Sequence, residues 1–282
     1  MRVVGPIERT RVLARDGESQ VEREDALAVE EPLEIRIRPA NRRTARPLVT
    51  TMRTPGNDEE LVAGLLFAEG ILRSREDLRG LERPVDRRID PELRANVMIA
   101  TLAEDAQARG EKLERGTVMG SACGVCGKTS IENVIPPETP PLVSKIRIRG
   151  EVLFALPDRL REGQSVFSRT GGLHAAGLFD AEGGLRALRE DIGRHNATDK
   201  LVGHFLLEGG LPLAESVLMV SGRAGFEIVQ KAYSAGIPVV ASVSAPSSLA
   251  VELAEAAGLT LVGFLRERRY NVYAHSGRIL PA

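Results

Sequence analysis

Apolar and polar positions follow different patterns in the two halves of the chain. In the C-terminal half, short apolar runs alternate with segments of helical spacing. Strands are predicted at 173–179, 185–189, 216–220, 238–242 and 259–265. Helices are predicted at 196–207, 225–235 and 247–257. Because strands that alternate with helices indicate βαβ crossovers, this half is predicted to form a three-layer α/β domain.

The N-terminal half carries fewer periodic segments and more charge. Strands are predicted at 33–38, where apolar and basic residues alternate, and at 48–52 and 96–102. The turn 54–60 leads into a helix that Asn57 or Asp58 can cap, and acidic residues occupy its first turn. Leu61 and Leu65 share one face of that helix. These elements predict a small α+β unit.

Residues 103–141 show no clear period and are rich in glycine, proline, serine and charge. A loop of this length is uncommon unless it is functional or a linker. Its last residues, 136–141, are proline-rich and therefore extended and stiff. We place the domain boundary here. The predicted units are an N-terminal α+β domain at 1–118, a flexible cysteine-containing loop and linker at 119–141, and the C-terminal domain at 142–282.

The overall composition argues against several classes of protein. The chain of 282 residues has a net charge of −1, so no basic field indicates a nucleic-acid partner. It has no uninterrupted apolar run of about 18 residues, so no membrane span is predicted, and its first residues lack a signal peptide's apolar core. Both cysteines lie in one C-x-x-C pair, which in a reducing cytosol is typical of metal-binding or catalytic sites. We therefore expect a cytoplasmic protein.

The segment GSACGVCGKTS at 120–130 contains that pair, Cys123 and Cys126. A structural zinc site needs four ligands, yet the chain has no second C-x-x-C and only four scattered histidines. One of them, His204, falls on an apolar helical stripe, where we expect it to be packed. A Walker-type phosphate loop requires glycine at the position of Ala122. Neither zinc nor phosphate therefore explains the segment well.

A redox site or a carrier of activated sulfur fits the segment better. Lys128 can lower the pKa of a nearby thiol. A thioredoxin-like motif normally follows a strand within a βαβ unit, whereas a glycine-rich loop between domains suits a thiol that visits two partners. We therefore favour a carrier. A zinc-dependent deaminase is disfavoured because no histidine is followed by glutamate in H-x-E order.

Polar segments flank several of the predicted C-terminal strands. They are 168–172, 191–200, 221–225, 242–247 and 264–269. Ligands of such sheets bind beyond the carboxyl ends of the strands. At 221–225, glycines let backbone amides approach a ligand, a helix start follows, and Arg223 can bind phosphate through paired hydrogen bonds. Together these segments predict an anionic ligand with two phosphates, as in a nucleotide diphosphate group.

A series of motifs resembles the formate dehydrogenase accessory sulfurtransferases, the FdhD family. They are GSACGVCGKTSIE, FSRTGGLHAAGLF, EDIGRHNATDK and SGRAGFEIVQK. The resemblance implies that Cys123 carries persulfide sulfur from a cysteine desulfurase, with Cys126 as its partner. The sulfur acceptor it implies is the molybdenum cofactor with two molybdopterin guanine dinucleotides, Mo-bis(MGD), which formate dehydrogenase requires. The resemblance also implies a homodimer and a C-terminal domain similar to the cytidine deaminase fold, without its zinc signature.

The candidate site therefore has a sulfur-carrying part and a cofactor-binding part, with no metal ligand assigned. The catalytic candidates are Cys123 and Cys126. The cofactor-binding candidates are Phe264, Leu265, Arg266, Glu267, Arg268, Arg269, Ser221, Gly222, Arg223, His195, Asn196 and Lys200. A guanine nucleotide should bind as an analogue of the cofactor. The alternative is a cofactor chaperone whose cysteines hold zinc or are structural.

Overall fold

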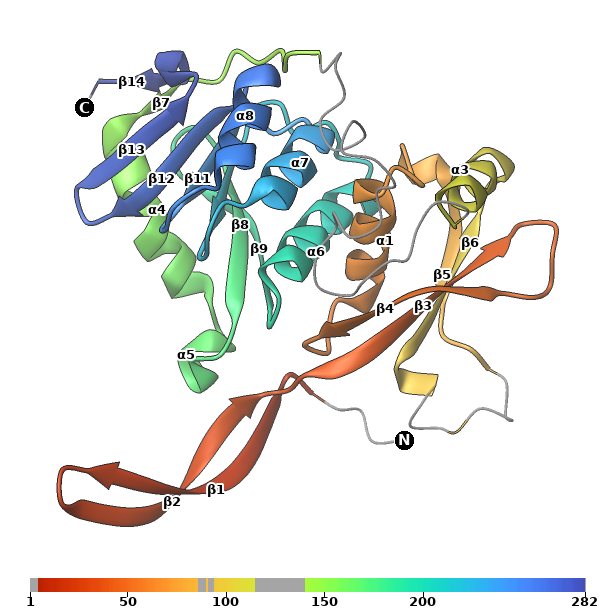
Figure 1. Ribbon diagram of the computed structural model, residues 1–282, viewed down its shortest axis with the longest axis horizontal. Helices are drawn as coiled ribbons and strands as arrows, with labels where there is room; N and C mark the ends of the chain where they lie inside the picture. Colours follow the sequence, from red (N-terminus) through yellow and green to blue (C-terminus); the bar gives the residue numbers. More distant parts are fainter. Residues whose placement is uncertain (1–4, 86–89, 91–93, 115–139, 282) are drawn as a thin grey trace.

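The structure is a computed structural model that describes residues 5–85, 90, 94–114 and 140–281. Its centre is a six-stranded sheet in the C-terminal half with the strand order β13-β12-β11-β10-β8-β9 (Figure 1). The strands are β8 (His174–Phe179), β9 (Leu185–Asp191), β10 (Val217–Val220), β11 (Val239–Ser242), β12 (Thr260–Arg266) and β13 (Arg269–Ala274). Strands β10, β11 and β12 run parallel, whereas β8 and β13 run antiparallel to their neighbours. The βαβ prediction is therefore confirmed for the centre of the sheet.

Helices cover both faces of this sheet and make three layers. One face packs against α6 (Arg194–Leu207), α7 (Phe226–Ser234) and α8 (Ser248–Ala256). The other packs against α4 (Gly150–Gly163). Alternate strand residues face the two layers, since Leu218 and Val220 belong to the first core and Val217 and Met219 to the second. Helix α4 lies in a region for which the sequence pattern predicts no element, and it contains Pro157, which disfavours a helix assignment.

The N-terminal half forms a second sheet, with the order β4-β3-β6-β5. Its strands are β3 (Glu31–Pro39), β4 (Arg46–Arg53), β5 (Leu78–Glu82) and β6 (Val97–Leu102). Helix α1 (Asp58–Ala68) packs on this sheet, and the short helix η1 (Arg75–Asp77) follows it. Asn57 occupies the N-cap position of α1 without a side-chain capping bond, because its backbone is left-handed at φ 56°. The capping prediction is therefore wrong for its side chain.

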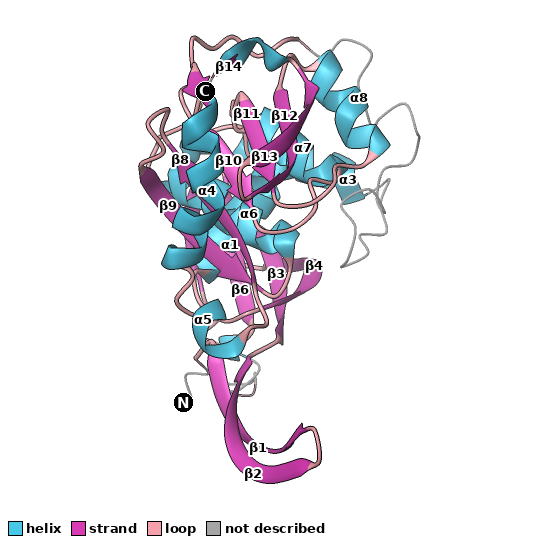
Figure 2. Cartoon of the chain, turned by 90° about the vertical axis from the view of Figure 1, so that its left-hand side faces the viewer, coloured by secondary structure: helices cyan, strands magenta, loops and turns pink. Residues whose placement is uncertain are grey.

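Several N-terminal elements were not expected from the sequence pattern. Helix α3 (Glu104–Glu114) lies within the stretch without a clear period, because its residues are mostly charged and its core contact rests on Ala106. Strands β1 (Ile7–Asp16) and β2 (Ser19–Ala28) form an antiparallel ribbon that projects from the rest of the chain in both Figure 1 and Figure 2. The ribbon is largely exposed, and neither strand contains a buried residue, so it lacks the buried apolar face that predicts a strand from sequence.

Short elements complete the chain. They are α5 (Phe167–Thr170), η3 (Ser276–Arg278) and a two-stranded parallel pair of β7 (Ile148–Arg149) with β14 (Ile279–Leu280). Helix α5 lies at the start of β8 and contacts β2. Of the predicted linker, residues 119–139 lie outside the described residues, so the predicted boundary stays a prediction there.

The two halves meet where α1 packs against α6. A Cβ atom at Gly64 would lie 1.9 Å from the carbonyl oxygen of Asp199, and one at Gly203 would lie 1.9 Å from that of Glu60. The two backbones are therefore in direct contact, which only glycine permits at these positions. Arg189 binds both carboxylate oxygens of Glu60 across the same interface, at 2.5 and 2.6 Å.

Candidate functional site

The sulfur-carrying part of the predicted site cannot be placed. Cys123 and Cys126 both lie outside the described residues. Their assignment as persulfide carrier and partner therefore stays a prediction.

The predicted anion-binding loops gather at one edge of the six-stranded sheet. Parallel strands β10, β11 and β12 all end at this edge. Because β8 and β13 are antiparallel to them, His174 and Arg269 at the starts of those strands lie at the same edge. Backbone hydrogen bonds join the loops, from Phe264 to Ser244 at 3.1 Å and from Ser247 to Ala224 at 3.2 Å. We call this region the carboxyl edge.

The turn between β12 and β13 presents charge at the carboxyl edge. Phe264 and Glu267 have left-handed backbone conformations, with φ of 54° and 55°. The side chains of Arg266, Glu267, Arg268 and Arg269 are exposed, whereas Leu265 is fully buried. Leu265 packs in the core beneath the turn, so it holds the turn in place and presents no side chain to a ligand.

The loop after β10 approaches the start of β8. Ser221 accepts a hydrogen bond from the amide of Ala175 through its hydroxyl at 2.9 Å, and its own amide donates to the Ala175 carbonyl at 3.0 Å. Gly222 lies beside His174, and Arg223 is exposed. Because Ser221 is engaged with β8, its role in the loop includes fixing the position of Gly222 and Arg223.

Asn196 and Lys200 on α6 are buried and bind the N-terminal half. The Asn196 amide donates to the carbonyl of Met52 at 2.7 Å and to Asp191 at 3.1 Å. The Lys200 ammonium lies 2.7 Å from the Asp191 carboxylate and 2.9 Å from the carbonyl of Thr54. Asn196 is 7% exposed and Lys200 is 2% exposed. Their polar atoms are engaged with the N-terminal half, so in this structure they hold the carboxyl edge in position and do not point hydrogen-bond donors at a ligand there.

His195 occupies the start of α6 in an unusual electrostatic setting. Its Nδ1 atom lies 3.3 Å from the Glu227 carboxylate on α7. Burial, and then the charges of Arg194 and Lys231 and the neighbouring His174, nevertheless lower the pKa of His195 to about 3. The imidazole is therefore neutral at physiological pH, and it can act as a hydrogen-bonding group but not as a cation.

Lys231 and Asp199 make a second polar contact one turn further along α6 and α7. Their side-chain atoms are 2.5 Å apart, and both groups are buried. Burial raises the pKa of Asp199, and Lys231 opposes that shift. His204 lies about another turn along α6. The prediction that it is simply packed is incomplete, because its Nδ1 atom lies 3.2 Å from the Glu60 carboxylate and its ring is partly exposed.

Two residues of the carboxyl edge were missed as binding candidates. His174 starts β8, where burial and the charge of Arg194 lower its pKa. Arg194 is the first residue of α6, and its Nε atom is buried. Both fall within motifs noted in the sequence, but their proximity depends on the antiparallel placement of β8, which no local pattern reveals.

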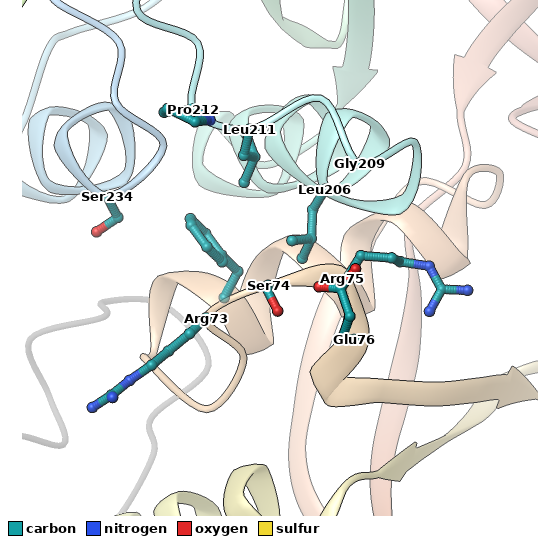
Figure 3. Close-up of a pocket in the computed structure, with 10 residues that line it drawn as sticks. Arg73, Ser74, Arg75, Glu76, Leu206, Gly209, Leu211, Pro212 and Ser234 are labelled. Atoms are coloured by element: carbon teal, nitrogen blue, oxygen red, sulfur yellow. The ribbon is translucent and has the colours of Figure 1, made fainter.

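A cavity of about 260 Å³ lies at the other end of α1, α6 and α7 (Figure 3). Its wall includes Phe67, Leu206, Leu211, Pro212 and Ser234. In Figure 3 the side chains of Arg73 and Arg75 at its margin point away from each other. The cavity includes none of the candidate residues.

The described part of the chain contains neither a cluster of metal-ligating side chains nor a membrane-spanning helix. Within residues 5–85, 90, 94–114 and 140–281, no three His, Cys, Asp or Glu side chains gather closely enough to hold a metal ion. In the same residues, no helix has both the length and the apolar character needed to cross a membrane.

Comparison with known proteins gives consistent matches along nearly the whole chain. A sequence model of the FdhD/NarQ family matches residues 28–280. The sulfur carrier protein FdhD of Streptomyces avermitilis is 50% identical over 96% of this chain and 95% of its own length. That of Mycobacterium tuberculosis is 47% identical over 96% and 97%. The crystal structure of a candidate formate dehydrogenase accessory protein from Desulfotalea psychrophila superposes with a TM-score of 0.73 at 24% identity, covering 97% of this chain and 99% of that chain, which supports the fold.

Proposed function

The chain belongs to the FdhD/NarQ family, and from this we propose that it is a sulfur carrier that serves formate dehydrogenase. The main support is that relatives up to 50% identical, matched over nearly their whole length, bear the name sulfur carrier protein. The C-x-x-C pair at Cys123 and Cys126 supplies the thiol that this role needs.

The sulfur-transfer chemistry that we propose runs through Cys123. Its thiolate attacks the outer sulfur of a persulfide on a cysteine desulfurase, and the desulfurase cysteine leaves as a thiolate. The outer sulfur is then bound to Cys123 as a persulfide, and no net oxidation has occurred. Cys123 next delivers this sulfur to Mo-bis(MGD), the substrate of the transfer, and returns to the thiolate, and the acceptor supplies the two electrons that reduce the sulfane sulfur to the sulfide level. Alternatively, the Cys126 thiolate attacks the inner sulfur of the Cys123 persulfide, so that a Cys123–Cys126 disulfide forms and the outer sulfur leaves as sulfide, the two cysteines supplying its two electrons.

We assign the acceptor to the carboxyl edge of the six-stranded sheet. The observation that carries this proposal is the gathering of the 221–225 and 264–269 loops at one edge. Their exposed side chains include Arg223, Arg266, Arg268 and Arg269, whose guanidinium groups suit the phosphates of a guanine dinucleotide. Asn196, Lys200 and Leu265 keep these loops in position. A homodimer, a cytoplasmic location and the likeness to the cytidine deaminase fold belong to the same proposal.

The test uses the intact protein loaded with sulfur by a cysteine desulfurase and cysteine. Mass spectrometry should find labile sulfur on Cys123, and a Cys123→Ala protein should carry none and fail to activate formate dehydrogenase. Cys126→Ala is the matched variant, because it removes the other thiol of the same motif. Sulfur loading and activation that both survive in Cys123→Ala would refute the carrier assignment. One zinc per chain that is lost with either cysteine would favour the chaperone alternative.

A further inference from the structure

Two polar side chains at the carboxyl edge stand together without a partner in the described structure. Arg194 begins α6, and its Nε atom is buried with no hydrogen-bond acceptor among the described residues. The ring of His174 lies beside it at the start of β8 and is partly buried. Across the described ranges, neither side chain forms an ion pair. Among the residues that the structure describes, the guanidinium of Arg194 therefore has no counter-charge at a partly buried position.

Two carboxylates, one close to Arg194 in the sequence and one on the neighbouring helix α7, are committed elsewhere. Asp191 binds Lys200 through one oxygen and the Gly193 amide through the other. Glu227 faces His195 rather than Arg194. A partly buried guanidinium with no anion and a buried donor with no acceptor both destabilise a folded chain. Within the described residues, Arg194 therefore has an electrostatic deficit that an incoming anion would remove.

The surroundings suit an anion of phosphate size. A Cβ atom at Gly222 would lie 3.3 Å from Nδ1 of His174 and 3.6 Å from Cδ of Arg194, so the loop backbone runs directly past both side chains. Helices α6 and α7 both begin at this edge, and their N-termini carry partial positive charge. The neighbouring histidines His174 and His195 have lowered pKa values and can donate or accept a hydrogen bond as neutral rings.

We propose that Arg194, together with His174 and the Gly222 backbone, forms a binding subsite for a phosphate group of the nucleotide ligand. This assignment rests on the proposed function for the identity of the ligand as a guanine nucleotide. It adds a partly buried binding residue to the exposed arginines of the 221–225 and 264–269 loops. Arg194 is set deeper than those arginines, so it fixes the depth at which the phosphate sits, whereas the exposed arginines contribute attraction at the rim.

The test measures binding of GDP and of pyrophosphate to the full chain by isothermal titration calorimetry. Arg194→Gln should weaken GDP binding about 10- to 100-fold, as expected for the loss of a charge-assisted hydrogen bond to phosphate. The matched control is Arg43→Gln. Arg43 is exposed and precedes the first residue of β4, whereas the contact of Thr54 with the C-terminal half follows the last residue of that strand. This control makes the same change of net charge and should leave the affinity unchanged. Arg194→Lys keeps the positive charge but cannot make the paired hydrogen bonds of a guanidinium, so it should give an intermediate loss of GDP affinity. It replaces Arg194→Gln if that variant does not fold.

The outcomes separate this inference from the proposed function. GDP binding that is equal in Arg194→Gln and wild type overturns the subsite, whatever the effect of replacing Arg266 or Arg268. Pyrophosphate binding that depends on Arg194, with no binding of GDP, supports the subsite and refutes the guanine nucleotide. Wild-type protein that binds neither probe overturns both. The melting temperature without ligand should not fall in Arg194→Gln, because an unpaired charge has been removed. A fall without any loss of affinity would identify a structural role and refute the subsite.

Discussion

Gly203 offers a direct test of how tightly the two halves are joined. Replacing it with alanine would place a Cβ atom 1.9 Å from the carbonyl oxygen of Glu60 and 2.7 Å from the amide nitrogen of Gly64. Both neighbours are backbone atoms of α1, so no side chain can turn aside to relieve the clash. To bring the first distance to about 3.0 Å, the closest approach that a Cβ tolerates, α1 and α6 must separate by about 1.1 Å.

The cost of that separation follows from the bonds that cross the interface. Lys200 to Thr54, Asn196 to Met52 and Arg189 to Glu60 are all shorter than 3.0 Å and would stretch beyond hydrogen-bond range. Overpacking costs about 1–3 kcal/mol, and each lost bond adds about 1 kcal/mol. The helix preference for alanine over glycine returns about 1 kcal/mol. We therefore expect Gly203→Ala to lower the free energy of unfolding by about 3–5 kcal/mol.

The assay is equilibrium unfolding in urea, with Gly110→Ala as the matched control. Gly110 also lies within a helix, α3, but a Cβ atom there would be 3.4 Å from Cδ1 of Ile37, an ordinary packing distance. This control should be neutral or more stable by up to about 1 kcal/mol. If Gly203→Ala unfolds at the same urea concentration as wild type, the backbone contact between α1 and α6 is not as described here.

Two further predictions concern buried ionisable groups. Because the folded pKa of His195 is about 3 and its ordinary value is 6.5, the unfolded chain binds the proton first, so stability is lost as pH falls from about 6.5 towards 3. Between pH 7 and pH 5 this loss of unfolding free energy reaches at most about 2 kcal/mol. Urea unfolding at the two pH values should show a smaller loss in His195→Gln than in wild type. An equal loss in the two proteins would refute the lowered pKa of His195. Lys200→Met should lower the free energy of unfolding by about 3–5 kcal/mol, because it leaves the carboxylate of Asp191 buried without its cation. The double variant with Asp191→Asn should recover part of that loss, and a single variant as stable as wild type would contradict the buried pair.

The regular part of the C-terminal half was predictable because burial there follows strict periods. The predicted strand 216–220 and helix 225–235 correspond to β10 and α7 within a residue at each end. Helix α3 and the β1–β2 ribbon escaped prediction because most of their residues are polar or charged and show no clear apolar period. Helix α4 does have one, with Leu153, Leu156 and Leu160 buried, but Pro157 interrupts it.

The candidate site was predictable only as far as parallel strands place their ends together. That rule brings the 221–225 and 264–269 loops to one edge, and the structure agrees. It says nothing about His174, since a residue at the start of a strand reaches this edge only if the strand is antiparallel. Nor does it show that Asn196 and Lys200 face the N-terminal half. Their partners at Met52 and Thr54 are backbone carbonyls, and carbonyls leave no signature in a sequence.

The contacts of Thr54 explain why the N-terminal half matters to a site built from the C-terminal sheet. Its amide donates to Asp191 at 3.2 Å, its hydroxyl accepts from the amide of Ile192 at 3.2 Å, and its carbonyl accepts from Lys200. These bonds hold the end of β9, the start of the short connection that follows it and the second turn of α6, whose first residues, Arg194 and His195, lie at the carboxyl edge. The turn before α1 therefore fixes the start of α6 without touching the proposed ligand. Helices α1 and α6 are also in close backbone contact at Gly64 and Gly203. The position of the carboxyl edge therefore depends on both halves, and a shift of α1 must move the residues proposed to bind phosphate.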